Sequence, residues 1–161
     1  ARESFALSSR YRTLFCPLGS FMLLSEEVAQ RAALTTCHEH LEKGGLLALC
    51  LDRPSVTPPM AEPRLRREAR RTDGALLRAW EQALASDTPG IERWRMTNEV
   101  LRDGAVADRE SHIMRLRPQP PERMTALLTA AGFAEIKLLD DKGERPLRAD
   151  DESYIAVARR A

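Results

Sequence analysis

The chain has 161 residues, of which 43% are hydrophobic, 30% charged and 5% aromatic. This favours one globular domain and argues against a disordered chain or a disulfide-rich mini-protein. The formal net charge of +1, from 25 Lys+Arg against 24 Asp+Glu, excludes a strongly basic nucleic-acid module as the default interpretation, although not a local basic patch. No apolar run approaches the roughly 18 residues of a membrane span and no segment has the layout of a signal peptide, so we expect a cytoplasmic protein with no membrane partner.

The three cysteines, Cys16, Cys37 and Cys50, are widely spaced and lie within apolar segments. This pattern indicates reduced, buried thiols, which suits a cytoplasmic protein. Cys37 is followed closely by His38 and His40, but on a helix only Cys37 and His40 would share a face. Zinc requires about four ligands and no others can be named, so we expect no metal.

The first 54 residues predict a strand, a helix and a second strand. Residues 11–16 are enriched in strand formers and are followed by Pro17 and Gly19. Ser25 is the expected N-cap of a helix that ends at the Gly44-Gly45 pair. Residues 46–51 form a continuous apolar run, which is typical of a strand buried on both faces of a parallel sheet.

Residues 55–74 are rich in proline and arginine and predict a linker. The basic cluster Arg64–Arg71 within it has two interpretations. It is either a solvated connection or an anion-binding lid, because arginine forks suit carboxylate and phosphate.

Residues 75–117 predict three antiparallel strands, with a hairpin turn at Asp103-Gly104. The segment 75–85 fits a helix equally well, and we prefer a strand because of its neighbours. A helix from Pro121 and two further strands complete the chain. The order β-α-β, three antiparallel strands, α-β-β predicts the α/β class.

Three segments, in this order, resemble the C-terminal part of class I S-adenosylmethionine (SAM)-dependent methyltransferases. They are Tyr-Arg-Thr-Leu-Phe-Cys-Pro-Leu-Gly-Ser-Phe at 11–21, His-Leu-Glu-Lys-Gly-Gly-Leu-Leu-Ala-Leu at 40–49 and Glu-Arg-Met-Thr-Ala-Leu-Leu-Thr-Ala-Ala-Gly-Phe at 122–133. The resemblance implies a single domain over 1–161 with a partial Rossmann-like methyltransferase sheet. Residues 1–54 and 118–161 would form the Rossmann-like part, 75–117 a substrate-side antiparallel insertion and 55–74 the linker.

The family holds SAM chiefly through a glycine-rich turn and acidic residues in its N-terminal half, and the sequence has no GxGxG motif. The resemblance places the first five residues after the family's third strand, so the N-terminal half is expected to be missing. SAM is then the implied cofactor, with doubtful binding by this chain alone. The strand at 11–16 would lie on a bare sheet edge, which predicts a homo-oligomer or a separate N-terminal half as partner. The alternative is that other elements of the chain cover this edge.

By resemblance, Cys16, Pro17 and Leu18 would line the methionine side of a SAM pocket. Three following residues would face the substrate, although core packing is as good an interpretation for the last two: Ser20, Phe21 and Met22. Cys16 itself is expected to be a small buried residue rather than a nucleophile.

Two residues of the insertion are further candidates. His112 is a weak candidate for a general base, with a structural histidine as the more usual alternative. Arg109 shares a strand face with Arg115 and Arg117 and could hold an anionic acceptor. The alternative is that this face is solvated and that its arginines are paired.

Three functions follow. The first is the C-terminal portion of a methyltransferase-like protein that acts on a small molecule and is inactive alone. The second is a non-catalytic interaction or oligomerisation module derived from that fold. The third, nucleic-acid binding through Arg64–Arg71, is disfavoured by the charge balance and the few aromatics, so we expect no nucleic-acid partner.

Overall fold

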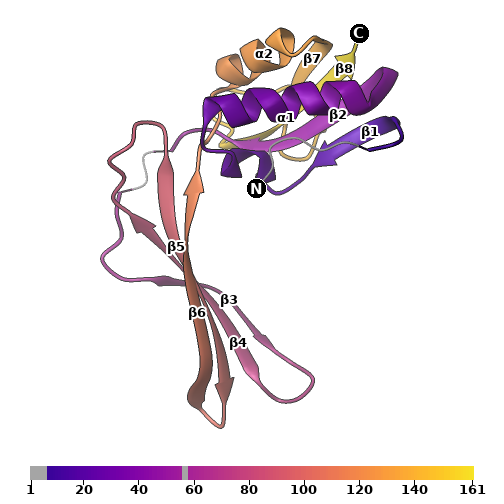
Figure 1. Ribbon diagram of the computed structural model, residues 1–161. Helices are drawn as coiled ribbons and strands as arrows, with labels where there is room; N and C mark the ends of the chain where they lie inside the picture. The colour runs from indigo at the N-terminus through magenta and orange to yellow at the C-terminus, as the bar shows by residue number, and fades with distance from the viewer. Residues whose placement is uncertain (1–6, 56–57) are drawn as a thin grey trace. The chain divides into compact units, whose positions relative to one another are not determined.

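The structure is a computed structural model and describes residues 7–55 and 58–161 (Figure 1). The expected place of the first five residues lies outside these ranges. The described residues divide into two compact units, one within Ala1–Ser55 and Arg117–Ala161 and the other within Val56–Leu116. The units contain helices, a mixed sheet and an antiparallel sheet, so the predicted α/β class is confirmed.

The first unit is built on a four-stranded sheet, sheet A, in the order β1-β2-β8-β7. Its strands are β1 (Tyr11–Cys16), β2 (Leu41–Asp52), β7 (Phe133–Asp140) and β8 (Ser153–Arg160). β1 runs parallel to β2, and the other two pairings are antiparallel. β1 is therefore an edge strand, with β2 as its one partner among the described residues.

Two helices, α1 (Glu27–His40) and α2 (Pro121–Ala130), cover one face of sheet A (Figure 1). The sheet residues beneath them are at most 1% exposed and alternate along β2 and β8: Leu47, Leu49, Leu51, Tyr154, Ala156 and Ala158. Leu34 from α1 and Leu128 from α2 complete this core. An ion pair of 3.1 Å between Arg123 Nη2 and Glu27 Oε2 joins the two helices at the surface.

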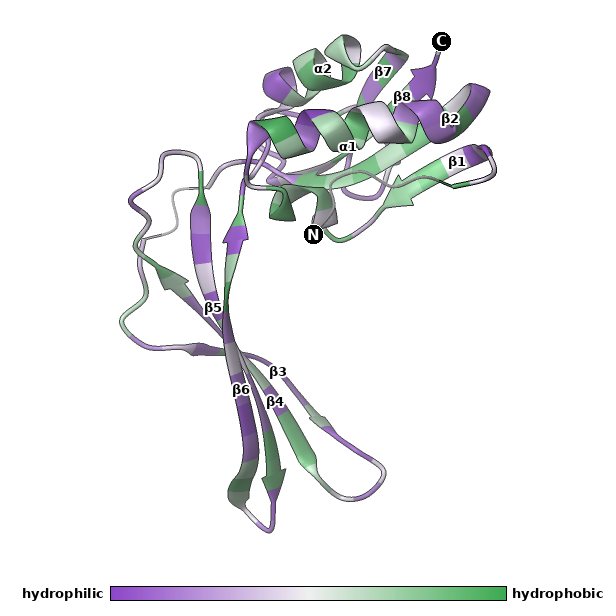
Figure 2. Ribbon diagram, viewed as in Figure 1, coloured by the Kyte–Doolittle hydropathy of each residue, from purple (hydrophilic) through white to green (hydrophobic). Residues whose placement is uncertain are grey.

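The alternate residues of β2, Leu46, Ala48 and Cys50, lie on the other face of sheet A and are only half-buried. β2 is hydrophobic over most of its length (Figure 2). A strand with two apolar faces is typical of a sheet that is covered on both sides. Within the described residues, the helices cover one side.

The boundary between α1 and β2 differs from the prediction. The structure places Glu26, not Ser25, at the N-cap of α1, and ends the helix at His40. The Gly44-Gly45 pair lies inside β2, where Gly44 has a φ of 74° and the register with β1 shifts between Tyr11 and Thr13. The two glycines thus belong to an irregular part of the strand and do not end the helix.

The second unit is an antiparallel sheet, sheet B, in the order β3-β4-β5-β6. Its strands are β3 (Arg64–Arg70), β4 (Leu76–Leu84), β5 (Glu92–Arg102) and β6 (Ala105–Leu116). The preference for a strand over 75–85 is confirmed, because β4 pairs along its length with β5. The hairpin at Asp103-Gly104 is also confirmed, with both residues at positive φ.

The prediction of a linker across 55–74 is wrong at Arg64–Arg70, which forms β3. The physical reason is cross-strand charge pairing with β4. Arg64 and Arg66 both contact the buried carboxylate of Glu81, and Arg78 Nε donates to Glu68 Oε2 at 2.7 Å. Arg64 and Arg66 of the basic cluster are therefore both paired with one glutamate within the sheet.

Candidate functional site

The first candidate site is the turn after β1, at the carboxyl end of sheet A's parallel strands. Leu18 and Gly19 both adopt left-handed conformations, with φ of 54° and 69°, and lead into the short 3-10 helix η1 (Ser20–Leu23). The Ser20 amide donates to the Pro17 carbonyl at 3.1 Å, and the Ser20 Oγ donates to the same carbonyl at 2.7 Å. The turn is thus closed by its own hydrogen bonds.

The predicted cofactor residues line this turn. Cys16 is half-buried, and burial raises the pKa of its thiol, an effect that the Phe21 amide partly opposes and Cys50 reinforces. A thiol whose pKa is raised is a poorer nucleophile at neutral pH. Pro17 is exposed and Leu18 is 95% exposed, so both present apolar surface at the edge of the turn.

The three residues expected to face the substrate separate into two environments. Ser20 is exposed, but Phe21 and Met22 are 5% and 2% exposed and belong to the core. The Asp52 amide lies 3.3 Å from Met22 Sδ, which ties the turn to the end of β2. For Phe21 and Met22 the core-packing interpretation describes the structure.

Hydrogen bonds to residues 117–119 connect the turn with the end of β2. The Met22 carbonyl accepts from the Arg117 amide at 2.8 Å, and the Asp52 carbonyl accepts from the Gln119 amide at 2.9 Å. The Tyr154 hydroxyl donates to the Gln119 carbonyl at 2.8 Å, and burial raises the pKa of this tyrosine. These bonds hold the carboxyl ends of β1 and β2 beside each other.

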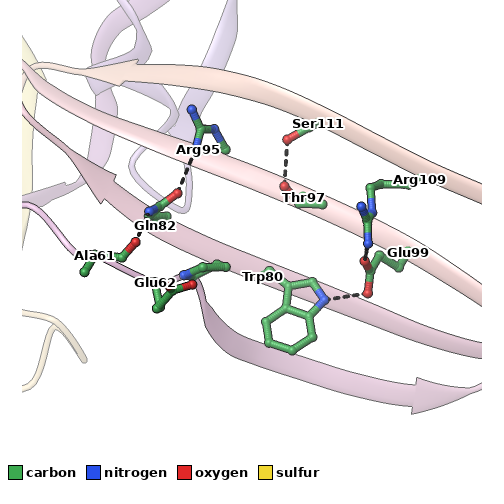
Figure 3. A pocket seen from close by; sticks show the side chains of 10 residues that line it. Ala61, Glu62, Trp80, Gln82, Arg95, Thr97, Glu99, Arg109 and Ser111 are labelled. Atoms are coloured by element: carbon green, nitrogen blue, oxygen red, sulfur yellow. Dashed lines mark hydrogen bonds and ion pairs between the residues drawn. The ribbon is translucent and has the colours of Figure 1, made fainter. Parts of the chain in front are cut away.

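The second candidate site is an open pocket of about 560 Å³ over one face of sheet B, here called the sheet B pocket (Figure 3). Its floor is formed by alternate residues of three strands, and residues 61–63 form one wall. The floor residues are Trp80, Gln82, Arg95, Thr97, Glu99, Arg109 and Ser111.

Glu99 is the best-connected side chain of the sheet B pocket and is 7% exposed. Its Oε2 accepts from Trp80 Nε1 at 2.8 Å, and its Oε1 accepts from Arg109 Nε and Nη2 at 2.9 and 2.6 Å. The hydrogen bond from Trp80 and the Arg109 charge hold the Glu99 pKa below its usual range. This carboxylate therefore positions both the indole and the guanidinium.

Of the two candidates on β6, Arg109 lies in the sheet B pocket and His112 does not. Arg109 on β6 forms an ion pair with its register partner Glu99 on β5, so the paired alternative describes it. His112 is exposed and pairs in register with Met96, whereas the pocket-lining residues Thr97 and Ser111 pair with each other. Side chains alternate along strands, so His112 lies on the opposite face of sheet B.

Sequence reasoning missed most of the sheet B pocket, including Trp80, Gln82, Arg95 and Glu99. The signal that could have found them is the alternation of polar residues along β5, at 95, 97 and 99. This signal was missed because the apolar residues of β4 are spaced as they would be in a helix. The sequence therefore did not clearly identify β4 as the strand that pairs with β5.

The described part of the chain contains no group of three or more His, Cys, Asp or Glu side chains that could hold a metal ion. None of its helices is both long and apolar enough to cross a membrane.

No family model matches the sequence, and no curated protein matches it. Solved structures do. A SAM-dependent methyltransferase from Clostridium acetobutylicum matches with a TM-score of 0.81 and 12% identity, over 100% of this chain and 63% of that one. The sugar N-methyltransferase KedS8 from Streptoalloteichus matches with a TM-score of 0.70 and 18% identity, over 100% and 61%.

A third match is SAM-bound CalS10, an amino pentose methyltransferase from Micromonospora echinaspora, with a TM-score of 0.67 and 19% identity, over 100% and 63%. At these identities the likeness shows the fold alone, which the chain shares with these solved methyltransferase structures. The chain spans only about three fifths of the length of these structures.

Proposed function

We propose that this chain is the C-terminal portion of a SAM-dependent methyltransferase-like protein that acts on a small molecule, and that it is inactive alone. The observation that carries the proposal is the likeness of the whole chain to about three fifths of solved methyltransferases. In this proposal sheet A with α1 and α2 is part of a Rossmann-like methyltransferase sheet, and sheet B is the substrate-side insertion. The sugar and amino pentose methyltransferases among the matches make a small, hydroxylated acceptor the first class to test.

The cofactor proposed for this fold is SAM, and the residues of this chain fit it only in part. Cys16, Pro17 and Leu18 would supply one apolar wall at the carboxyl end of β1. The sequence has no GxGxG turn, the motif that lets backbone approach this cofactor in the family. We therefore derive no catalytic step from this chain by itself.

A complete site of this kind would need positioning more than acid or base strength. In methyl transfer, an acceptor lone pair forms a bond to the methyl carbon while the carbon–sulfur bond breaks and its electrons return to sulfur. An oxygen or nitrogen acceptor also releases a proton. The part of this chain would be to orient the acceptor.

The same proposal includes a partner at β1, either a second copy or a polypeptide that supplies the N-terminal half. An edge strand offers unpaired backbone groups to another chain. Phe15 and Tyr11 on this strand are 61% and 40% exposed, which adds apolar area to the edge. The half-buried face of β2 at Leu46, Ala48 and Cys50 gives such a partner more surface to cover.

A second candidate, favoured by the same edge, is a non-catalytic interaction or oligomerisation module. It requires the exposed apolar edge of β1 but no cofactor. The two candidates differ in one measurable property, which is whether SAM binds once a partner polypeptide completes the sheet.

The test is calorimetric titration of the chain with SAM, with its mass measured by light scattering. We expect no heat from the chain alone and a mass of a dimer or larger. The titration is then repeated with an N-terminal methyltransferase half, taken from one of the matched proteins, added as a second polypeptide. Restored binding supports the methyltransferase proposal, and association without binding supports the interaction module. Micromolar binding by the chain alone contradicts the proposal of an incomplete site.

A further inference from the structure

Trp80 gives the sheet B pocket an aromatic floor, and the N–H group of its indole is already hydrogen-bonded. The Trp80 N–H donates to Glu99, and both carboxylate oxygens of Glu99 are engaged. A ligand can therefore use the face of the indole but not its N–H. An aromatic face that is fixed in this way binds flat, C–H-rich surfaces.

Hydroxyl groups lie directly beside this floor. Trp80 pairs in register with Thr97, and Thr97 pairs with Ser111, so the three residues form one row across β4, β5 and β6. Thr97 Oγ1 and Ser111 Oγ are 2.6 Å apart, and either can be the donor. The pair can accept and donate hydrogen bonds at the same place, which matches a ligand that carries hydroxyl groups.

The positively charged Arg95 lies in the next row of pocket residues, where it pairs in register with Gln82. Arg95 is exposed, and its Nη1 donates to Gln82 Oε1 at 2.8 Å. Gln82 in turn donates to the Met60 carbonyl at 2.9 Å and to the Ala61 carbonyl at 3.0 Å. Figure 3 shows the contact with Ala61, which fixes Gln82 against the wall. Among the described residues, the other guanidinium nitrogens of Arg95 have no partner, and such a fork suits carboxylate or phosphate.

We propose that the sheet B pocket binds an anionic saccharide. The sugar ring lies on Trp80, ring hydroxyls bond to Thr97 and Ser111, and the carboxylate or phosphate binds Arg95. The pocket volume of about 560 Å³ falls within the roughly 300–1,000 Å³ of small-molecule sites. This inference does not depend on methyl transfer, because every group it uses lies within sheet B and its wall.

The chain offers a specific reporter for this binding. It has two tryptophans, and Trp94 pairs in register with Ala83 and Met114, not with pocket-lining residues. Trp94 therefore lies on the opposite face of sheet B from Trp80. In a Trp94→Phe variant of the full chain, all tryptophan fluorescence comes from Trp80.

The experiment titrates Trp94→Phe with methyl glucuronide, glucose 1-phosphate, glucose and inorganic phosphate. We expect a saturable fluorescence change with both anionic sugars, about tenfold weaker binding of glucose, and no change with phosphate alone. Arg95→Gln should reduce the affinity for the anionic sugars to that for glucose. The matched control, Arg93→Gln, lies on the same strand outside the pocket lining and should leave the affinity unchanged.

A flat Trp80 signal with every sugar overturns the proposal, as does an equal effect of Arg93→Gln and Arg95→Gln. Tighter binding of inorganic phosphate than of the two anionic sugars also overturns it. Binding of glucuronide only or of sugar phosphate only identifies the anion and supports it. If Trp94→Phe does not fold, calorimetry on the unmodified chain and on Arg95→Gln gives the same comparison.

Discussion

The Trp80 indole donates a 2.8 Å hydrogen bond to Oε2 of Glu99 across a diagonal of sheet B. The two are not register partners, because Trp80 pairs with Thr97 and Glu99 pairs with Arg78. The diagonal contact therefore links two rows of the sheet. It sets the orientation of the aromatic floor on which the sheet B pocket depends.

Replacing Glu99 with glutamine should lower the free energy of unfolding by about 1 kcal/mol at neutral pH. It should also make this free energy less dependent on pH in the acid range. Glutamine can still accept from Trp80 but loses the Arg109 charge pair, whose arginine side chain is 61% exposed. The Glu99 pKa is lower in the folded state, so its contribution is complete above the unfolded value of about 4.3 and is lost as pH falls through the folded pKa.

Urea unfolding of both proteins between about pH 7 and pH 3 checks this prediction, with the stability difference shrinking as pH falls. Glu110→Gln is the matched control. It changes an exposed glutamate that pairs in register with Asn98 and so lies on the opposite face of sheet B. A constant difference across the pH range would show that the Glu99 charge is not the cause.

The sequence predicted the sheet A elements well because local signals mark them. A continuous apolar run indicates β2, and proline begins α2. It failed where partners are distant along the chain. Arg64 belongs to a strand because Glu81 lies opposite it, and no local pattern shows that pairing. The sheet B pocket was missed for the same reason, since its floor depends on the register of three strands.

Tyr154 should ionise only when the chain unfolds in alkali. It is 1% exposed, its hydroxyl donates to the Gln119 carbonyl, and burial raises its pKa. The folded pKa is the higher one, so the stabilising contribution is complete below about pH 10 and is lost as pH rises toward the folded value. In a Tyr11→Phe variant, absorbance at the phenolate band should rise together with loss of circular dichroism.

Tyr154→Phe should lower the free energy of unfolding by about 1 kcal/mol at neutral pH, because the Gln119 carbonyl loses its donor. Its alkaline unfolding should show no phenolate change when combined with Tyr11→Phe. Phenolate formation in the Tyr11→Phe variant well before unfolding would contradict a buried, hydrogen-bonded Tyr154 hydroxyl.

Phe15→Glu should reduce self-association with little loss of stability. Phe15 lies on the edge strand β1 and is 61% exposed, so a charge there is solvated in the monomer but hinders pairing of the edge with another chain. Sedimentation velocity over a range of concentrations measures the change. Val28→Glu is the matched control, since Val28 is an apolar residue of α1 that is 77% exposed. An equal effect of both variants would point to general hydrophobic association instead of the β1 edge.

Gly19→Ala should destabilise the turn after β1 more than the same change elsewhere. Gly19 has a φ of 69°, and a Cβ added to it would lie 2.6 Å from Met22 Cε. Met22 is buried, and its sulfur lies against the Asp52 amide, so its methyl group is not free to move.

Gly104→Ala separates the two causes of this cost, because Gly104 has a similar φ of 80° and nothing within 4 Å of an added Cβ. We expect about 1 kcal/mol for Gly104→Ala from backbone strain, and about 1 kcal/mol more for Gly19→Ala from displacement of Met22. Urea unfolding of both variants, and of Gly19→Ala combined with Met22→Ala, measures the difference. Gly19→Ala should cost less in the Met22→Ala background than in the unmodified chain, because removing the Met22 side chain removes the clash. Equal costs for the two glycine variants would mean that the turn yields easily and does not hold the ends of β1 and β2 together.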